Sequence, residues 1–71
     1  MTLYQQIQSP SGILALMVLR VDDGACIPFD PANTDYANFK AQINADEAQL
    51  EDADGNLMTP EEAKAYVATL P

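Results

Sequence analysis

The sequence predicts a small single α+β domain, with about four to five short strands in β-hairpins and two short helices. Three observations support this class. Turn sequences with a glycine follow apolar stretches at Asp22-Asp23-Gly24 and again at Asp52-Ala53-Asp54-Gly55. Residues 34–44 have the apolar spacing of a helix, and a helix-capping sequence begins at Thr59. A chain of 71 residues can form one hydrophobic core, so residues 1–71 are expected to be one domain.

The N-terminal part is expected to supply strands. Residues 2–8 alternate loosely between apolar side chains and glutamines, and Ser9-Pro10-Ser11-Gly12 has the composition of a turn. Residues 1–12 are therefore expected to form either a first strand or an arm that binds a partner. Residues 13–21 are apolar and partly β-branched, which is typical of a strand covered on both faces or packed against another chain.

A hairpin and a helix are expected next. Asp22-Asp23-Gly24 is a strong hairpin signal, and Ala25-Cys26-Ile27 is the expected return strand, with Cys26 in the core. Pro28 limits this strand to an edge of the sheet or ends it.

In residues 34–44, apolar side chains recur at i, i+3 and i+7 and predict a helix that buries Tyr36, Phe39 and Ile43. Asp30 or Asn33 is its expected cap.

The C-terminal part predicts a second hairpin and a second helix. Residues 48–51 and 56–58 flank the Asp52-Ala53-Asp54-Gly55 turn as two short strands. Thr59 and Glu62 have the spacing of a capping box, and Pro60 suits the first helical position. The helix is expected over residues 61–70, with one apolar face.

The composition excludes several functional classes. Eleven acidic residues stand against three basic ones, for a formal net charge of −8. The negative field repels nucleic-acid phosphates and anionic lipids, so neither a nucleic acid nor a membrane is an expected partner. The apolar run 13–19 is much shorter than the ~20 residues needed to span a bilayer.

The sequence also lacks the side chains of the common catalytic and metal sites. It contains no histidine and a single cysteine, Cys26. Histidine-dependent catalysis, the usual zinc sites and an intrachain disulfide are therefore excluded. The aspartate-glycine sequences are explained by turn geometry. We expect a protein that is not an enzyme and that uses no cofactor and no metal.

Residues 18–36 read V-L-R-V-D-D-G-A-C-I-P-F-D-P-A-N-T-D-Y. This stretch resembles a short module of tailed-bacteriophage proteins, in which a V-x-R-x-x-D-G-A-x-I-P hairpin leads into D-P-A-N-x-D-Y and a short aromatic helix. Such modules occur in small proteins encoded beside structural genes and at the front of tail-fibre assembly chaperones. The resemblance extends to residue 43, but the tryptophan that often follows in the family is missing here. It implies a small tailed-phage protein and transfers no functional residues.

The resulting expectation is a virion structural protein, either a capsid decoration protein or a minor tail or fibre-attachment component. Its expected partners are other phage structural proteins or copies of itself, in a virion assembled in the host cytoplasm. Two alternatives stay open: a tail-fibre assembly chaperone or adaptor, and a small acidic inhibitor of a host nucleic-acid-binding protein. The acid-free N-terminal part is the expected contact region, through Leu3, Tyr4, Ile7, Ile13, Leu14, Leu16 and Val18.

Overall fold

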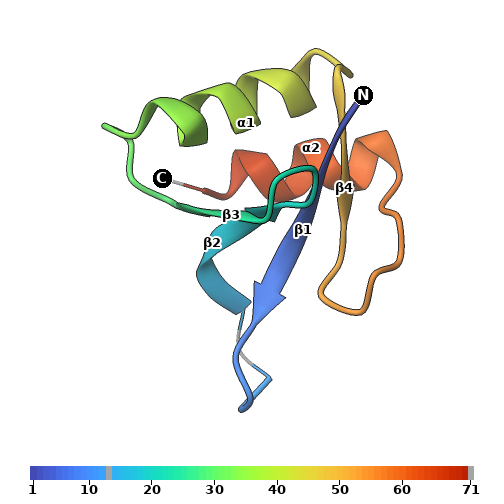
Figure 1. Cartoon of the computed structure of the whole chain (residues 1–71). Coiled ribbons are helices and arrows are strands. Elements are labelled where there is room, and N and C mark those ends of the chain that lie inside the picture. The colour runs from blue at the N-terminus through green and yellow to red at the C-terminus, as the bar shows by residue number, and fades with distance from the viewer. Residues whose placement is uncertain (13, 71) are drawn as a thin grey trace.

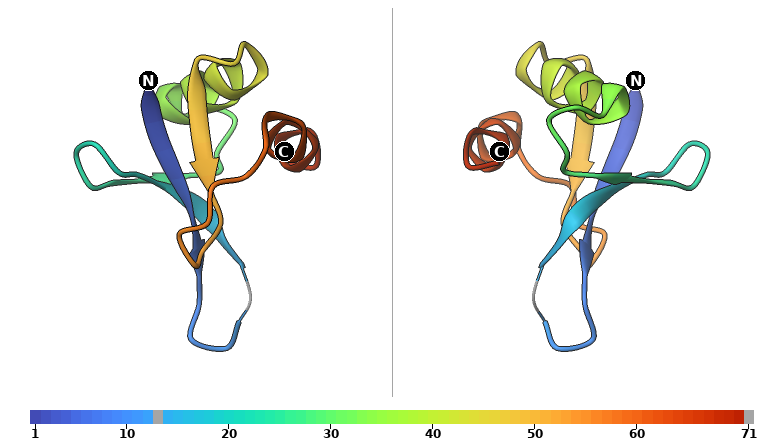
Figure 2. Two further views of the ribbon diagram at one scale, coloured as in Figure 1. Left: turned by 90° about the vertical axis from the view of Figure 1, so that its right-hand side faces the viewer. Right: turned by 90° about the vertical axis from the view of Figure 1, so that its left-hand side faces the viewer.

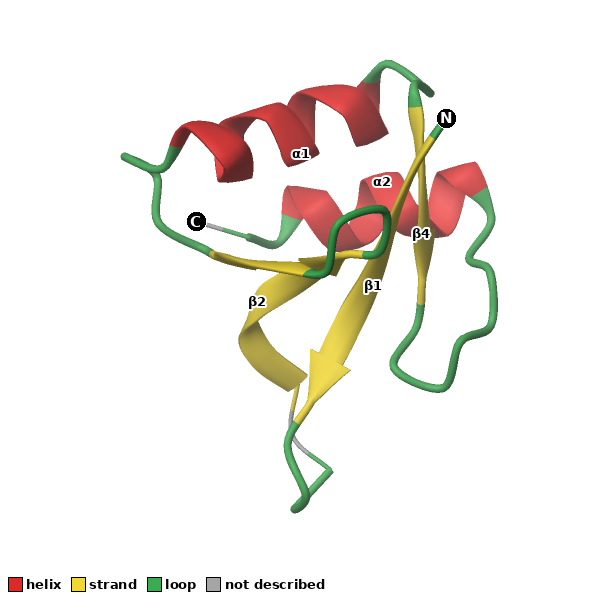
Figure 3. Cartoon of the chain, viewed as in Figure 1, coloured by secondary structure: helices red, strands yellow, loops and turns green. Residues whose placement is uncertain are grey.

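The computed structural model describes residues 1–12 and 14–70 and shows a four-stranded mixed sheet with two helices (Figure 1). The elements along the chain are β1 (Thr2–Gln8), β2 (Leu14–Arg20), β3 (Ala25–Pro28), α1 (Thr34–Asn44), β4 (Ala48–Glu51) and α2 (Pro60–Ala68). Figure 3 shows how the helices and strands alternate with the connecting loops. The predicted α+β class is confirmed.

The strand order in the sheet is β3-β2-β1-β4, so the first strand is central and the last strand is an edge. β1 pairs antiparallel with β2, and β2 pairs antiparallel with β3. β4 returns beside β1 in parallel, with Leu50 opposite Tyr4. Residues 2–8 are therefore a central strand of the domain rather than a separate arm.

Each helix begins at the cap that its sequence favours. The Asn33 side chain accepts a hydrogen bond from the Tyr36 backbone N–H at 3.1 Å, which identifies Asn33 as the cap of α1. At α2, the Thr59 hydroxyl accepts from the Glu62 N–H, and the Glu62 carboxylate accepts from the Thr59 N–H. This reciprocal pair is the predicted capping box.

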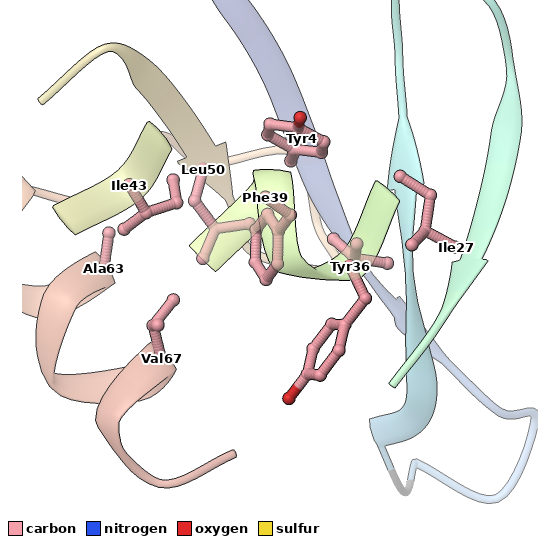
Figure 4. Packing of buried hydrophobic residues seen from close by; sticks show 9 residues of the cluster. Tyr4, Ile27, Tyr36, Phe39, Ile43, Leu50, Ala63 and Val67 are labelled. Carbon is pink, nitrogen blue, oxygen red and sulfur yellow. The ribbon is translucent and has the colours of Figure 1, made fainter. Parts of the chain in front are cut away.

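Both helices pack on the same face of the sheet and close one apolar core (Figure 4). The Tyr4 and Phe39 rings meet edge to face with centroids 4.8 Å apart, and the Tyr4 hydroxyl donates to Gln42 Oε1 at 2.6 Å. The residues buried in this core are Tyr4, Val18, Ile27, Tyr36, Phe39, Ile43, Leu50, Ala63 and Val67.

Three expectations about the strands need correction. Residues 56–58 form a single bridge, between Glu51 and Leu57, instead of a fifth strand. Residues 14–20 form the expected strand, but the helices cover only one of its faces, while Ile13 lies outside the described residues. Cys26 is exposed, because it alternates with the buried Ile27 and therefore points away from the helices.

Candidate protein-binding surface

The sheet has one face covered by helices and one face that no described element covers. Tyr4, Val18, Ile27 and Leu50 point from the four strands toward α1 and α2. Because successive side chains of a strand point to opposite faces, their neighbours point the other way. Figure 2 agrees, since α1 and α2 lie together while the β2–β3 turn extends away from them. We call this uncovered side of the sheet the outer face.

Cross-strand pairing defines which residues share the outer face. Leu19 lies opposite both Gln5 and Cys26, and Leu3 lies opposite Gln49. The Val21 N–H donates to the Leu3 carbonyl at 2.9 Å, which places these two residues opposite each other as well. By pairing and alternation, the outer face consists of Leu3, Gln5, Ile7, Met17, Leu19, Val21, Cys26, Pro28, Gln49 and Glu51.

The outer face is apolar across its three neighbouring strands β1, β2 and β3. Leu3, Ile7, Met17 and Leu19 are partly buried, and Val21 is 40% exposed. A sheet with one face in water normally alternates apolar residues on the core side with polar residues on the solvent side. Contiguous apolar side chains on the solvent side are instead typical of a surface that binds another protein.

The basic side chains of the chain are held by its own residues. Arg20 Nη2 lies 2.8 Å from Asp23 Oδ2, and its Nη1 lies 3.5 Å from Asp35 Oδ1. The Lys64 ammonium lies 2.9 Å from Asp46, and the Lys40 ammonium lies 4.8 Å from the centre of the Tyr36 ring.

The ion pair of Arg20 and Asp23 shifts the pKa of both groups. The hydrogen bond from Arg20 is the main reason that the pKa of Asp23 is lowered, and a second bond from the Ala25 N–H adds to it. The same pair raises the pKa of Arg20. Both groups are therefore charged at neutral pH and compensate each other at the start of the β2–β3 turn.

Two carboxylates flank the apolar part of the outer face. Glu51 lies on β4 and points to this face, because its neighbour Leu50 points into the core. Asp22 is an exposed residue of the β2–β3 turn, directly after Val21. No lysine or arginine belongs to the outer-face set within the described chain. The surface is thus apolar in its centre and negative at two sides.

The two edges of the sheet are poorly suited to accept another strand. β3 has only four residues, Pro28 has no backbone N–H, and the Pro28 carbonyl accepts from Asp30 at 2.9 Å. At the other edge, the Leu50 carbonyl accepts from Met58 at 2.9 Å, and the Asp52 N–H donates to Asn56 at 2.8 Å. Short strands, proline and local covering are common protections against edge pairing. The outer face, and not an edge, is therefore the better contact surface.

The structure divides the expected contact residues into four groups. Leu3 and Ile7 belong to the outer face. Tyr4 and Val18 are 2% and 0% exposed in the core, so they are unavailable for a partner and leave the candidate set. Leu16 is exposed at 77%. Ile13 and the side chain of Leu14 lie outside the described parts of the structure.

The sequence prediction for β2 included Leu16 and Val18 but neither Met17 nor Leu19. Val18 is buried in the core and Leu16 is exposed, whereas Met17 and Leu19 point to the outer face. The available signal was the period-2 rule, which assigns Met17 and Leu19 to one face once Val18 is assigned to the other. No polar residue interrupts the run 13–19, so its composition alone did not distinguish the two faces.

A groove of about 480 Å³ lies between β4, the end of α1 and the start of α2. Ile43, Leu50 and Ala63 contribute apolar surface to it, and the pair of Lys64 and Asp46 lies at its border. No metal-holding group of side chains lies at this groove among the described residues.

The Asp52-Ala53-Asp54-Gly55 segment is explained by turn geometry. Asp52 Oδ1 accepts hydrogen bonds from the Asn56 N–H at 2.9 Å and from the Asp54 N–H at 3.0 Å. These bonds lower the pKa of Asp52, and the bond from the Asn56 N–H has the largest effect. Gly55 has a φ of 88°, a conformation that glycine adopts without strain.

No group of three or more histidine, cysteine, aspartate or glutamate side chains is arranged to hold a metal ion in residues 1–12 and 14–70. Neither α1 nor α2 has the length and apolar content needed to cross a bilayer. Comparisons with protein-family models, with curated proteins and with solved structures found no match to this chain.

Proposed function

We propose that this chain is a bacteriophage virion structural protein that acts through protein–protein contacts made by the outer face of its sheet. The observation that carries the proposal is an apolar, uncovered sheet face on a chain of net charge −8. Burial of apolar surface is the main favourable term in protein association, so this face gains free energy when another chain covers it. A role in capsid decoration or in a minor tail or fibre-attachment component fits such a surface.

The phage setting rests on the resemblance of residues 18–43 to the tailed-phage module. Those residues form β3, α1 and the end of β2, and they supply Leu19, Val21 and Cys26 to the outer face. The resembling segment and the candidate contact surface therefore overlap. A small domain has a small margin of stability, and binding to an assembled particle adds to it by mass action.

The direct test is quantitative mass spectrometry of purified phage particles. The proposal predicts peptides of this chain in fixed stoichiometry with the major structural proteins. Hundreds of copies would indicate decoration of the capsid lattice, and a few to a few tens would indicate the tail or a fibre. Absence from particles, with abundant protein in the infected lysate, would contradict the virion role and favour an assembly chaperone or an inhibitor.

A further inference from the structure

The charges at the outer face bear on which kind of chain can cover it. In a two-fold symmetric pair, the same patch meets itself, so each group faces groups of the same surface. The outer face offers Glu51 within it and Asp22 beside it, but no basic side chain among its described residues. Self-pairing would therefore remove carboxylates from water without a compensating cation, which is costly.

The basic side chains elsewhere do not change this result. Arg20 is held by Asp23 and Asp35, and Lys64 is held by Asp46. Lys40 lies over the Tyr36 ring on the helix side of the molecule. A second copy would have to break one of these contacts to supply a lysine or arginine side chain to Glu51 or Asp22.

We infer that the occupant of the outer face is a different protein chain, whose contact surface is an apolar patch flanked by lysine or arginine side chains. This inference rests on the proposed function, because it assigns the chemistry of the partner at the same surface. Leu3, Met17 and Leu19 form the apolar contact, and Glu51 and Asp22 face the partner's cations. The apolar centre supplies most of the affinity, whereas the flanking charges set the association rate and the choice of partner.

The probes for this inference are three amphipathic helical peptides that share one leucine face. Their polar faces consist of lysine, of glutamine or of glutamate. Each peptide is titrated into the ¹⁵N-labelled full chain, and binding is followed by the chemical shifts of the backbone amides. Sedimentation of the chain alone at the same concentrations measures self-association.

The inference predicts that the lysine peptide shifts amides of β1, β2 and β3 around Leu3 and Leu19. It should bind at least ~10-fold more tightly than the glutamate peptide at low salt, and 0.2 M salt should reduce this difference severalfold, because screening acts over ~10 Å. Glu51→Gln should weaken binding of the lysine peptide. Glu47→Gln, which removes the same charge from an exposed residue between α1 and β4, should not.

Three results would overturn the inference, and they separate it from the proposed function. Equal binding of the lysine, glutamine and glutamate peptides at the outer face would keep the contact surface and refute the cationic partner. Stable dimers of the chain alone, with the amides of β2 perturbed, would identify a second copy as the occupant. Lysine-peptide shifts at acidic groups elsewhere, without shifts in β1 or β2, would refute both the cationic partner and the contact surface.

Discussion

Both faces of the sheet carry apolar side chains, but the two faces differ in how deeply those side chains are buried. On the inner face, Tyr4, Val18 and Ile27 are at most 2% exposed beneath α1 and α2. On the outer face, Leu19 and Met17 come from the same strand as Val18, yet they are only partly buried and are not part of the core cluster. The core beneath the helices is built without them, so their side chains are available for the proposed association.

The largest expected effect separates the inner face from the outer face in stability. Phe39 is fully buried against Tyr4 and Phe29, so Phe39→Ala should lower the free energy of unfolding by about 3–5 kcal/mol. In a domain of this size, a loss of that magnitude removes most of the stability. Urea denaturation followed by circular dichroism measures it.

The matched variant on the outer face is Leu19→Ala. Since Leu19 keeps part of its surface in water and no helix packs on it, its truncation should cost less than that of Phe39, about 1 kcal/mol. Equal losses for Phe39→Ala and Leu19→Ala would show that the outer face is part of the domain's own core, and the contrast between the faces would fail.

A substitution that reverses the character of the outer face should act on association rather than on folding. Leu19→Lys places a cation in the centre of the proposed apolar contact. There it would meet the apolar patch of the partner and lie near the partner's own lysine or arginine side chains. Incorporation of this variant into particles should fall at least ~10-fold, because one unfavourable charge at an interface costs more than a kilocalorie per mole. Complementation of a deletion phage, with particles quantified by mass spectrometry, measures incorporation.

Ala41→Lys is the control for that experiment. Ala41 is an exposed residue of α1, on the helix side of the molecule, so its change to lysine alters the net charge equally. Normal incorporation of Ala41→Lys and loss of Leu19→Lys would localise the contact. Equal loss for both variants would trace the effect to net charge instead.

The capping box of α2 predicts a smaller effect on stability. Thr59→Ala removes the acceptor for the Glu62 N–H and should lower the free energy of unfolding by about 1 kcal/mol. Thr34→Ala, at an exposed position at the start of α1, should have a smaller effect. Thermal melts of the two variants provide the comparison, and identical shifts would contradict the capping role of Thr59.

The smallest expected effect is on the pH dependence of stability. The pKa of Asp23 is lower in the folded chain than its usual value of 3.8, mainly because Arg20 donates to it. The ionised form therefore stabilises the fold above pH ~4, and this contribution is lost as the pH falls through the folded pKa. Asp23→Asn should flatten the loss of stability below pH 4, measured by urea denaturation from pH 6 to pH 2. An unchanged acid limb would show that the pair contributes nothing to folding.

The local elements could be predicted from sequence because short-range chemistry determines them. Asn33 and Thr59 start their helices through side-chain bonds to residues three positions ahead, and Pro60 reinforces the second start. The spacing of Tyr36, Phe39 and Ile43 identified the buried side of α1 correctly. These signals lie within one or two turns of chain and need no tertiary information.

The sheet order could not be predicted in the same way. The parallel pair of β1 and β4 joins Tyr4 to Leu50, and no turn signal connects strands so distant in sequence. The register shift between Gln6 and Gln8 is also invisible without the partner strand. Cys26 was expected in the core because its neighbours in sequence are apolar. It is exposed because it alternates with the buried Ile27 along β3. The residues of the outer face therefore follow from the strand pairing, which assigns each strand position to one face of the sheet.

Cross-linking from Cys26 shows whether another chain covers the outer face, because this exposed residue is the chain's single thiol and lies on that face. A maleimide-benzophenone label at Cys26, activated by light in assembling particles, should form cross-links to another phage structural protein. The same label on the double variant C26S/A41C, on the exposed side of α1, should form few. Cross-links from residue 41 but none from Cys26 would contradict the outer face as the contact surface.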